Sequence, residues 1–496
     1  MTDSRQRLST GILGLDEVLG GGLIRGGIYL VMGKPGAGKT ICGNQICFAH
    51  AARKERAAYV TLLAETHSRM TMNLERMRFF SPGPIGESLL YLGGYMPLRE
   101  KGLPGLLDLL RRVMRAEKPS LLVIDGLMTS RSYASSDIAL KEFIIELQVL
   151  GTMNECTTLL LSNMTAEDLN GPEHTMVDGL IELRMEAARE RTLRVLEVIK
   201  MRGSRHYLGK QEMSITEEGL VVYPNTEERL TRIARTAPPC TGRLSTGVQN
   251  LDGMLGGGLR AGSTTMALGF SGSGKTMLGQ HFLSSGEEKS LYFGFYESPE
   301  RFLEAGDALG LSLRRRFDSG QMGILWQPAR RHGLDSLSQL LLENVTRRDA
   351  KRVVIDGFDG LRQASFANPE RVTSYLTSIL NELRARDVTV LFTEETSKAM
   401  GPEIEVRVEG VSALVENIVL LDYVDVGTQL KRLLSVIKQR GSAYESAIRE
   451  LVIGPQGMQL ADDSRSAEEI LGTATARSMP LYLRSRRGPP AGSSGF

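Results

Sequence analysis

Short apolar runs, each ending at a polar or glycine-rich segment, recur along the chain and predict buried strands. They lie at residues 28–32, 57–63, 121–124, 157–161, 265–268, 291–296, 353–355 and 388–392. The residues after the first run, 41–50, can continue as a helix, and Ser298-Pro299-Glu300 is typical of a helix N-cap and first turn. Strands that alternate with helices favour an α/β fold, in which a mostly parallel sheet is flanked by helices.

Two further segments alternate apolar with polar or charged residues and predict strands with one polar face. They span 193–204 and 433–442. Lys200 and Arg202 are two residues apart, as are Lys438 and Arg440, so each pair is expected on one face of its strand. A solvated sheet edge would explain either pair. Because both belong to a repeated Lys-x-Arg-Gly-Ser sequence, we favour cations directed at phosphate.

A glycine-rich loop with the spacing of a Walker A phosphate-binding loop follows the first apolar run. In such loops backbone N–H groups surround the phosphates, a lysine reaches the outer phosphates, and a Thr or Ser holds Mg²⁺. The pattern occurs again after an apolar run in the second half of the chain. The predicted binding residues are Gly33, Gly36, Ala37, Gly38, Lys39 and Thr40 in the first half, and Gly269, Gly272, Ser273, Gly274, Lys275 and Thr276 in the second.

The two loops belong to a longer internal duplication. Residues 7–23 contain Arg-Leu-Ser-Thr-Gly, Leu-Asp and Gly-Gly-Gly-Leu, and the same letters recur in 243–259. The separation between Gly33 and Gly269 equals the separation between these two segments, so each segment and the loop that follows it repeat together without an insertion. Two linked motifs in register indicate duplication rather than chance.

Carboxylates follow apolar runs in both halves. Asp125 and Asp356 each end a run, which is the Walker B pattern, and are expected to orient the water shell of a nucleotide-bound Mg²⁺. Glu65 and Glu297 follow other runs. Because ligands of parallel sheets gather at the carboxyl ends of the strands, each glutamate is expected to face the nucleotide of its own half.

Chain length and local composition predict the domain limits. The length of 496 residues exceeds one hydrophobic core of usual size and suggests roughly two to four domains. We expect domains at 1–224 and 243–476, joined by a linker at 225–242 that is poor in large apolar residues. The basic, Gly/Pro/Ser-containing segment 477–496 is expected to be a flexible tail.

Composition argues against several classes of protein. A net charge of +2 gives no general attraction to nucleic acid or to an anionic membrane. The first residues lack the apolar core of a secretion signal and no apolar run approaches a membrane-spanning length, so we expect a cytoplasmic protein. The cysteines show no CxxC spacing and no histidine cluster, so neither a metal site nor a disulfide framework is expected. They are Cys42, Cys47, Cys156 and Cys240.

With its doubled loops, repeated preceding segments and Lys-x-Arg-Gly-Ser strands, the chain resembles the KaiC family of circadian-clock-type ATPases and autokinases over about residues 5–475. The resemblance implies two tandem RecA-like P-loop NTPase domains in a two-tier homo-hexameric ring, with ATP and Mg²⁺ bound between neighbouring subunits. By the same resemblance, four basic residues would reach the γ-phosphate of the neighbouring subunit. They are Lys200, Arg202, Lys438 and Arg440.

The chain departs from the family pattern at two places. KaiC proteins often carry paired glutamates after the second strand, whereas this chain has Ala64-Glu65 and Tyr296-Glu297, so hydrolysis depends on whether the remaining glutamate activates water. Clock members phosphorylate adjacent Ser and Thr residues. Ser412 fits the first acceptor, but Ala413 has no hydroxyl, so a two-site phosphorylation cycle cannot operate here.

Three functions remain open at this point. The leading hypothesis is an oligomeric Mg²⁺-ATPase that acts as a regulatory ring on protein partners, with serine autokinase activity at Ser412 as a further hypothesis. The single glutamates leave a nucleotide-gated scaffold with little hydrolysis as the alternative. A DNA-dependent RecA-like motor is opposed by the near-neutral charge and by the lack of a basic, aromatic-rich segment.

Overall fold

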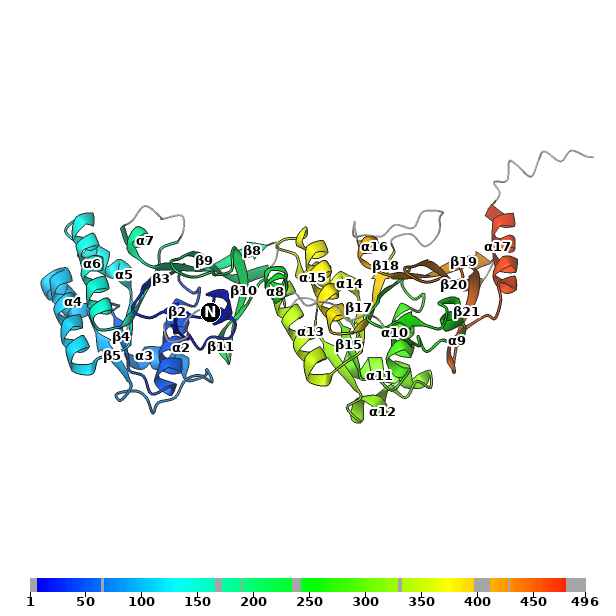
Figure 1. Ribbon diagram of the computed structural model, residues 1–496, viewed down its shortest axis with the longest axis horizontal. Helices are drawn as coiled ribbons and strands as arrows, with labels where there is room; N and C mark the ends of the chain where they lie inside the picture. The colour runs from blue at the N-terminus through cyan, green and yellow to red at the C-terminus, as the bar shows by residue number, and fades with distance from the viewer. Residues whose placement is uncertain are drawn as a thin grey trace, which may run out of the picture. The chain divides into compact units, whose positions relative to one another are not determined.

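The computed structural model describes residues 7–63, 67–165, 172–188, 191–233, 242–328, 332–396, 411–426 and 429–478. The chain divides into two compact units, Met1–Arg229 and Leu230–Phe496 (Figure 1). Each unit is built on a nine-stranded sheet that is mostly parallel. This architecture confirms the predicted pair of α/β domains.

The sheet of the first unit has the order β11-β10-β9-β8-β3-β7-β6-β4-β5, in which β8 to β5 are six mutually parallel strands and β9, β10 and β11 add three antiparallel pairings at one side. Its strands are β3 (Ile28–Met32), β4 (Ala57–Thr61), β5 (Leu89–Gly93), β6 (Leu121–Asp125), β7 (Thr157–Ser162), β8 (Gly179–Ala188), β9 (Arg191–Met201), β10 (Lys210–Thr216) and β11 (Gly219–Tyr223). The helices are α1 (Leu15–Val18), α2 (Lys39–Ala52), α3 (His67–Leu74), α4 (Tyr95–Glu117), α5 (Leu127–Ser132), α6 (Asp137–Met153), α7 (Pro172–Met176) and α8 (Thr226–Ile233).

Both faces of this sheet are buried, which explains why its strands are continuous apolar runs rather than alternating ones. On β3, Tyr29 and Val31 pack into the core formed with α2, whereas Leu30 and Met32 pack into the core formed with α4 and α6. The parallel strands therefore all end at one edge between two helical layers, and this edge carries the phosphate loop.

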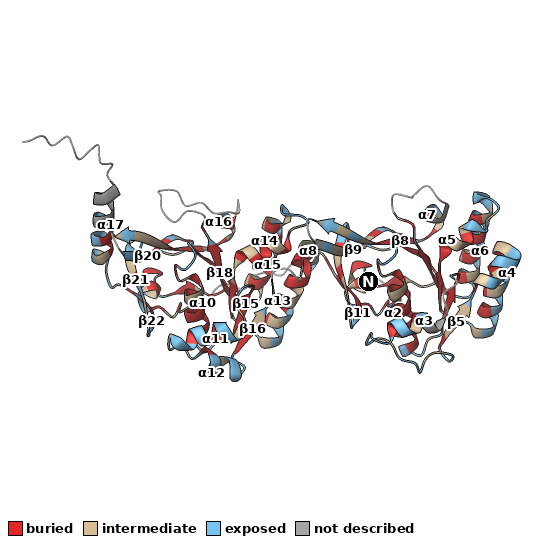
Figure 2. Cartoon of the chain, turned by 180° about the vertical axis from the view of Figure 1, so that it is seen from behind, coloured by how far each residue is buried: buried red, intermediate tan, exposed pale blue. Residues whose placement is uncertain are grey.

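The second unit repeats the plan, in the strand order β16-β15-β17-β18-β14-β19-β20-β21-β22. Its strands are β14 (Thr264–Gly269), β15 (Ser290–Gly294), β16 (Met322–Trp326), β17 (Arg352–Asp356), β18 (Thr389–Glu395), β19 (Asn417–Val426), β20 (Gln429–Gln439), β21 (Ile448–Gly454) and β22 (Gly457–Leu460). The helices are α9 (Gln249–Met254), α10 (Lys275–Ser284), α11 (Pro299–Ala308), α12 (Leu313–Asp318), α13 (Leu334–Arg348), α14 (Phe358–Ala364), α15 (Arg371–Ala385), α16 (Val411–Leu414) and α17 (Arg465–Ser478). Figure 2 shows the buried residues concentrated on the sheets and on the inward faces of the helices.

The duplicated segment before each loop forms a small structure of its own. In the first unit β1 (Arg7–Leu8) pairs with β2 (Leu23–Ile24), and in the second β12 (Arg243–Leu244) pairs with β13 (Leu259–Arg260). The Asp16 carboxylate accepts hydrogen bonds from the Thr10 N–H and hydroxyl at 2.8 and 2.6 Å. Asp252 repeats this with Thr246 at 2.7 Å in both bonds. In each half, therefore, the Ser-Thr-Gly and Leu-Asp sequences form a single turn that is closed by hydrogen bonds from the threonine to the aspartate.

Several expectations meet the described residues only in part. The division between Arg229 and Leu230 falls inside the predicted linker 225–242, part of which is helix α8, and the exact domain limits stay a prediction. Helix α17 ends at Ser478, so the predicted tail lies almost wholly outside the described residues. Cys42, Cys47 and Cys156 are buried free thiols, and Cys240 lies outside the described residues. Among the helices of the described ranges, none combines the length and apolar content needed to cross a lipid bilayer.

The second unit buries one arginine at a position where the first unit has leucine. Arg352 opens β17 as Leu121 opens β6, and its side chain is almost fully buried. The guanidinium donates to the carbonyls of Ser245 and Phe282 at 2.7 and 3.2 Å and forms an ion pair with Glu288 at 3.0 Å. It therefore connects three segments of the unit.

Arg352→Leu is expected to lower the free energy of unfolding of the second unit by about 3 kcal/mol, because the Ser245 and Phe282 carbonyls lose a charged donor and only the single Ser285 hydroxyl remains to serve both of them. Trp326, the only tryptophan of the chain, lies in β16 and reports unfolding of this unit by fluorescence in a denaturant titration. Arg347→Leu, at an exposed position of α13, is the control and should change the free energy by less than about 0.5 kcal/mol. Equal effects of the two substitutions would contradict the assignment.

Candidate functional site

The first phosphate loop connects β3 to α2 and has the backbone that its glycines predict. Gly36 and Gly38 have φ of 82° and 110°, and a Cβ on Gly33 would lie 2.1 Å from the Leu183 carbonyl oxygen. Lys39 opens α2, and its Nζ donates to the Gly33 carbonyl at 2.6 Å. Side chains larger than hydrogen are thus excluded where the chain must turn back on itself.

The second loop repeats this geometry between β14 and α10. Gly272 and Gly274 have φ of 79° and 110°, and a Cβ on Gly269 would lie 2.1 Å from the Leu421 carbonyl oxygen. Lys275 Nζ donates to the Gly269 carbonyl at 2.9 Å. Ala37 and Ser273 are buried at equivalent positions of the two loops, so the loops share their packing as well as their spacing.

Each loop ends at a hydroxyl that contacts the carboxylate predicted to orient Mg²⁺. Thr40 Oγ1 donates to Asp125 Oδ2 at 3.1 Å, and Thr276 Oγ1 donates to Asp356 Oδ2 at 3.0 Å. A hydroxyl and a carboxylate are ligands of the kind that Mg²⁺ takes in nucleotide sites, where phosphates and water supply the rest. Within the described ranges no cluster of three or more His, Cys, Asp or Glu could hold a metal ion by itself. Each pair therefore fits a metal that arrives with phosphate.

Burial determines the electrostatics of the two lysines. It lowers the pKa of Lys39, and the Asp125 carboxylate opposes this shift. Burial also lowers the pKa of Lys275, where Glu395 and Asp356 are the main opposing charges. Both lysines are buried residues, so an anion in the loop would interact with them in a medium of lower dielectric constant than water.

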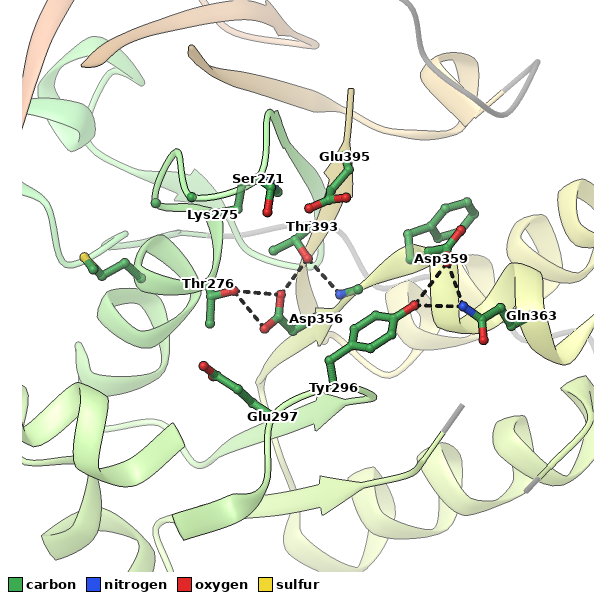
Figure 3. Close-up of a pocket in the computed structure, with 15 residues that line it drawn as sticks. Ser271, Lys275, Thr276, Tyr296, Glu297, Asp356, Asp359, Gln363, Thr393 and Glu395 are labelled. Atoms are coloured by element: carbon green, nitrogen blue, oxygen red, sulfur yellow. Dashed lines mark hydrogen bonds between the residues drawn. The ribbon is translucent and has the colours of Figure 1, made fainter. Parts of the chain in front are cut away.

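A cavity of about 640 Å³ opens at the second loop. Its wall contains Ser271, Lys275, Thr276, Tyr296, Glu297, Asp356, Asp359, Gln363, Thr393 and Glu395, which Figure 3 labels. The predicted phosphate and metal residues thus face the same space as the predicted catalytic glutamate. At its rim the Tyr296 hydroxyl donates to Asp359 Oδ2 at 3.1 Å, and Gln363 Nε2 donates to that same oxygen at 2.8 Å.

Glu297 has the environment of a base. Its Oε2 atom is buried and accepts no hydrogen bond from the described residues. Burial raises the pKa of Glu297, the negative charge of Asp356 raises it further, and Arg301 opposes both. A carboxylate with a raised pKa takes up a proton more readily, which suits activation of water. Its counterpart Glu65 lies outside the described residues.

Sequence reasoning missed the tyrosines that hold the metal-site carboxylates. The Tyr59 hydroxyl donates to Asp125 Oδ2 at 2.7 Å, and the Tyr292 hydroxyl donates to Asp356 Oδ2 at 3.0 Å. Thr393 adds a third donor in the second half, to Asp356 Oδ1 at 2.6 Å. The available signal was a tyrosine at the same place in both copies of an otherwise apolar strand.

The basic pairs lie away from the phosphate loops of their own units. Lys200 Nζ and Arg202 Nη2 donate to the Thr175 carbonyl at 3.0 and 3.4 Å, at the end of α7, which precedes β8. Lys438 Nζ donates to the Ser412 and Val415 carbonyls at 2.5 and 2.8 Å, beside α16, which precedes β19. These helices lie where parallel strands begin, whereas the loops follow strand ends. Within each unit, the structure therefore does not bring the basic residues together with the loop lysine of that unit.

Arg440 and Ser412 occupy exposed positions near this edge of the second sheet. Arg440 follows β20, with an exposed side chain, as Arg202 follows β9. Ser412 is the second residue of helix α16, and its side chain is exposed. Its carbonyl accepts a hydrogen bond from the Lys438 ammonium. The predicted phosphoacceptor therefore lies beside the second basic pair rather than beside the second loop.

Comparison with known proteins relates the whole chain to one family. A protein-family model described as "ATPase: KaiC" matches residues 8–227 and again 244–465. The circadian clock oscillator protein KaiC of Picosynechococcus sp. is 25% identical over 486 residues, covering 95% of this chain and 93% of that protein. KaiC 1 of Synechocystis sp. is 26% identical, with coverages of 95% and 92%, and KaiC of Synechococcus elongatus is 25% identical, with coverages of 95% and 92%. Because the family model matches most of the chain as two tandem repeats, the chain belongs to the KaiC family of ATPases.

Proposed function

We propose that the chain is a Mg²⁺-dependent ATPase with one nucleotide site in each half. The observation that carries the proposal is the repeated arrangement of a glycine loop, a buried lysine and a threonine bonded to an aspartate. In this role Lys39 and Lys275 neutralise phosphate charge, and Asp125 and Asp356 orient the water shell of Mg²⁺, which supplies further charge neutralisation when bound. Phosphoryl transfer requires mainly positioning and charge neutralisation, which these residues can supply.

The glutamates act on the attacking water in this proposal. Glu297 faces the cavity with a buried, unoccupied acceptor atom, and Glu65 follows the equivalent strand of the first half. Each would accept a proton as water attacks the γ-phosphate. The polar Tyr296 replaces the first glutamate of the family pair, and its hydroxyl is already bonded to Asp359, so Glu297 carries this role in the second half.

Each site is completed by a neighbouring subunit. Lys200 and Arg202 lie at the edge of the sheet away from their own loop, as do Lys438 and Arg440, which supports contact with the nucleotide of another copy of the chain. A head-to-tail contact of this kind forms a ring when its rotation closes and an open filament when it does not; the family resemblance supports the ring. We therefore propose a homo-oligomeric ring, a hexamer by family resemblance, that is cytoplasmic and regulates unidentified protein partners.

Serine autokinase activity is the second part of the proposal. Ser412 is exposed on α16 and lies next to Lys438, which we assign to a neighbour's γ-phosphate. The Ser412 oxygen would form a new bond to the γ-phosphorus while the bond from that phosphorus to the oxygen that bridges it to ADP breaks. ADP would leave, and the hydroxyl proton would pass to water. With Ala413 beside it, a single site is available.

Incubation with γ-³²P-labelled ATP tests both activities at once. Free phosphate and labelled protein are followed in the natural chain and in Ser412→Ala. We expect phosphate release in both chains and protein label in the natural chain alone. Release of phosphate without labelled protein would contradict the autokinase activity. Equal labelling of the natural chain and of Ser412→Ala would show that the phosphoacceptor is another residue. Absence of both signals would favour a nucleotide-gated scaffold, for which the single glutamate in each half is the supporting observation.

A further inference from the structure

A carboxylate lies beside the phosphate loop of the second half. Glu395 ends β18 and is the parallel strand partner of Gly269, the first residue of the loop. It lines the same cavity as Lys275 and Asp356, and Figure 3 shows its carboxylate on the loop side of that cavity. The Glu395 side chain is exposed, and its charge is the first among those that oppose the effect of burial on the Lys275 pKa. Glu395 therefore contributes negative charge where phosphate is expected.

The first half has an amide at the equivalent position. Strands β7 and β18 begin alike, because the hydroxyls of Thr157 and Thr389 each accept a hydrogen bond from a glycine N–H, at 3.1 and 2.9 Å. Asn163 follows Thr157 by as many residues as Glu395 follows Thr389. The two sites thus share the glycine spacing of the loop, the lysine, the threonine and the aspartate, whereas this strand end carries Ser162-Asn163 in the first half and Glu394-Glu395 in the second. Glu394 is buried and forms an ion pair with Arg362 at 3.2 Å, which balances its charge locally, whereas the Glu395 side chain is exposed.

We propose that Glu395 lowers the preference of the second site for nucleoside triphosphate over diphosphate. The inference rests on the proposed nucleotide sites. Loop N–H groups surround the inner phosphates, whereas the outer phosphate lies toward the lysine and the strand ends. A carboxylate at the strand end repels the outer phosphate more than the inner ones, because the Coulomb energy falls with distance. Asn163 leaves the first site without this repulsion, so the two tiers hold different nucleotides at the same ATP/ADP ratio.

Exchange of the two residues tests the proposal. Affinities for Mg²⁺–ATP and Mg²⁺–ADP are measured by titration calorimetry in the full chain carrying Lys39→Ala, which leaves the second site, with and without Glu395→Gln. We expect the ratio of ATP to ADP affinity to rise about tenfold, with most of the change in ATP affinity. In the chain carrying Lys275→Ala, the reciprocal Asn163→Glu is expected to lower this ratio at the first site by about tenfold.

Ratios that stay within about twofold in both variants would overturn the proposal. A fall in ATP affinity on Glu395→Gln would also overturn it, because that sign belongs to a carboxylate that holds Mg²⁺. Unchanged ratios with nucleotide still bound leave the proposed function intact, whereas absence of any nucleotide binding in the Lys39→Ala chain overturns both. If a double variant does not fold, Glu395→Gln alone is compared with the natural chain for ATP and ADP bound per chain, where a smaller rise in the ratio is expected because the first site is unchanged.

Discussion

Replacement of both loop lysines, Lys39→Ala with Lys275→Ala, is expected to reduce ATP hydrolysis by at least about a hundredfold. Each lysine emerges from the first turn of a helix and donates to the first carbonyl of its loop, so its ammonium lies along the path that the phosphates take. Alanine leaves the loop backbone unchanged but removes the positive charge that stabilises the transferring phosphoryl group. Steady-state phosphate release measures the loss.

The two single variants divide this activity between the tiers. If one tier carries most of the hydrolysis, one lysine substitution removes nearly all phosphate release and the other removes little. Lys141→Ala, at an exposed position of α6, is the control and should leave the rate unchanged. Phosphate release at the natural rate from the double variant would contradict the assignment of both loops.

Loss of activity in these variants should not reflect unfolding. Burial lowers the pKa of Lys39 and of Lys275, so the folded chain holds each charged ammonium less favourably than water does. The penalty is present at neutral pH, where a free lysine is charged, and it disappears above the ordinary lysine pKa. Alanine at either position is therefore expected to leave the thermal unfolding midpoint unchanged or to raise it.

The loops and their aspartates were predictable because their determinants are local. Gly36 and Gly38 mark positive φ within the loop, and a lysine and a threonine follow at fixed spacing. Asp125 ends an apolar run, and parallel strands end at one edge of the sheet, so its place on the edge that carries Thr40 follows from fold class. The second half contains the same loop and the same aspartate after an apolar run. This repetition made the prediction of two nucleotide sites firmer than either pattern alone.

Contacts that depend on strand order could not be predicted in the same way. Tyr59 reaches Asp125 because β4 lies next to β6, and Glu395 reaches the loop because β18 lies next to β14. Neither adjacency can be inferred from the order of strands along the chain. The direction in which the basic side chains point was also not predictable from the sequence. Lys200 donates to a carbonyl of α7 because β9 returns antiparallel to β8 and so brings Lys200 to the start of β8.

Two inactive chains are expected to restore hydrolysis when mixed, if each site is shared between subunits. Both chains carry Lys275→Ala to silence the second tier. One also carries Lys39→Ala and keeps Arg202, and the other carries Arg202→Ala and keeps its loop. Each chain alone should lose at least about a hundredfold in phosphate release, since an arginine supplied to the γ-phosphate contributes this much or more. In a random equimolar ring about one quarter of first-tier sites join an intact loop to an intact Arg202.

The mixture distinguishes a shared site from a site within one chain. Neither chain contains both Lys39 and Arg202, so mixing restores nothing if the arginine serves the nucleotide of its own chain. Recovery of about a quarter of the rate of the Lys275→Ala chain requires that Arg202 cross to a neighbour. Arg115→Ala, at an exposed position of α4, replaces Arg202→Ala as the control and should be active without mixing. Since Arg202 bonds to the Thr175 carbonyl at the edge where the strands begin, away from its own loop, we expect recovery.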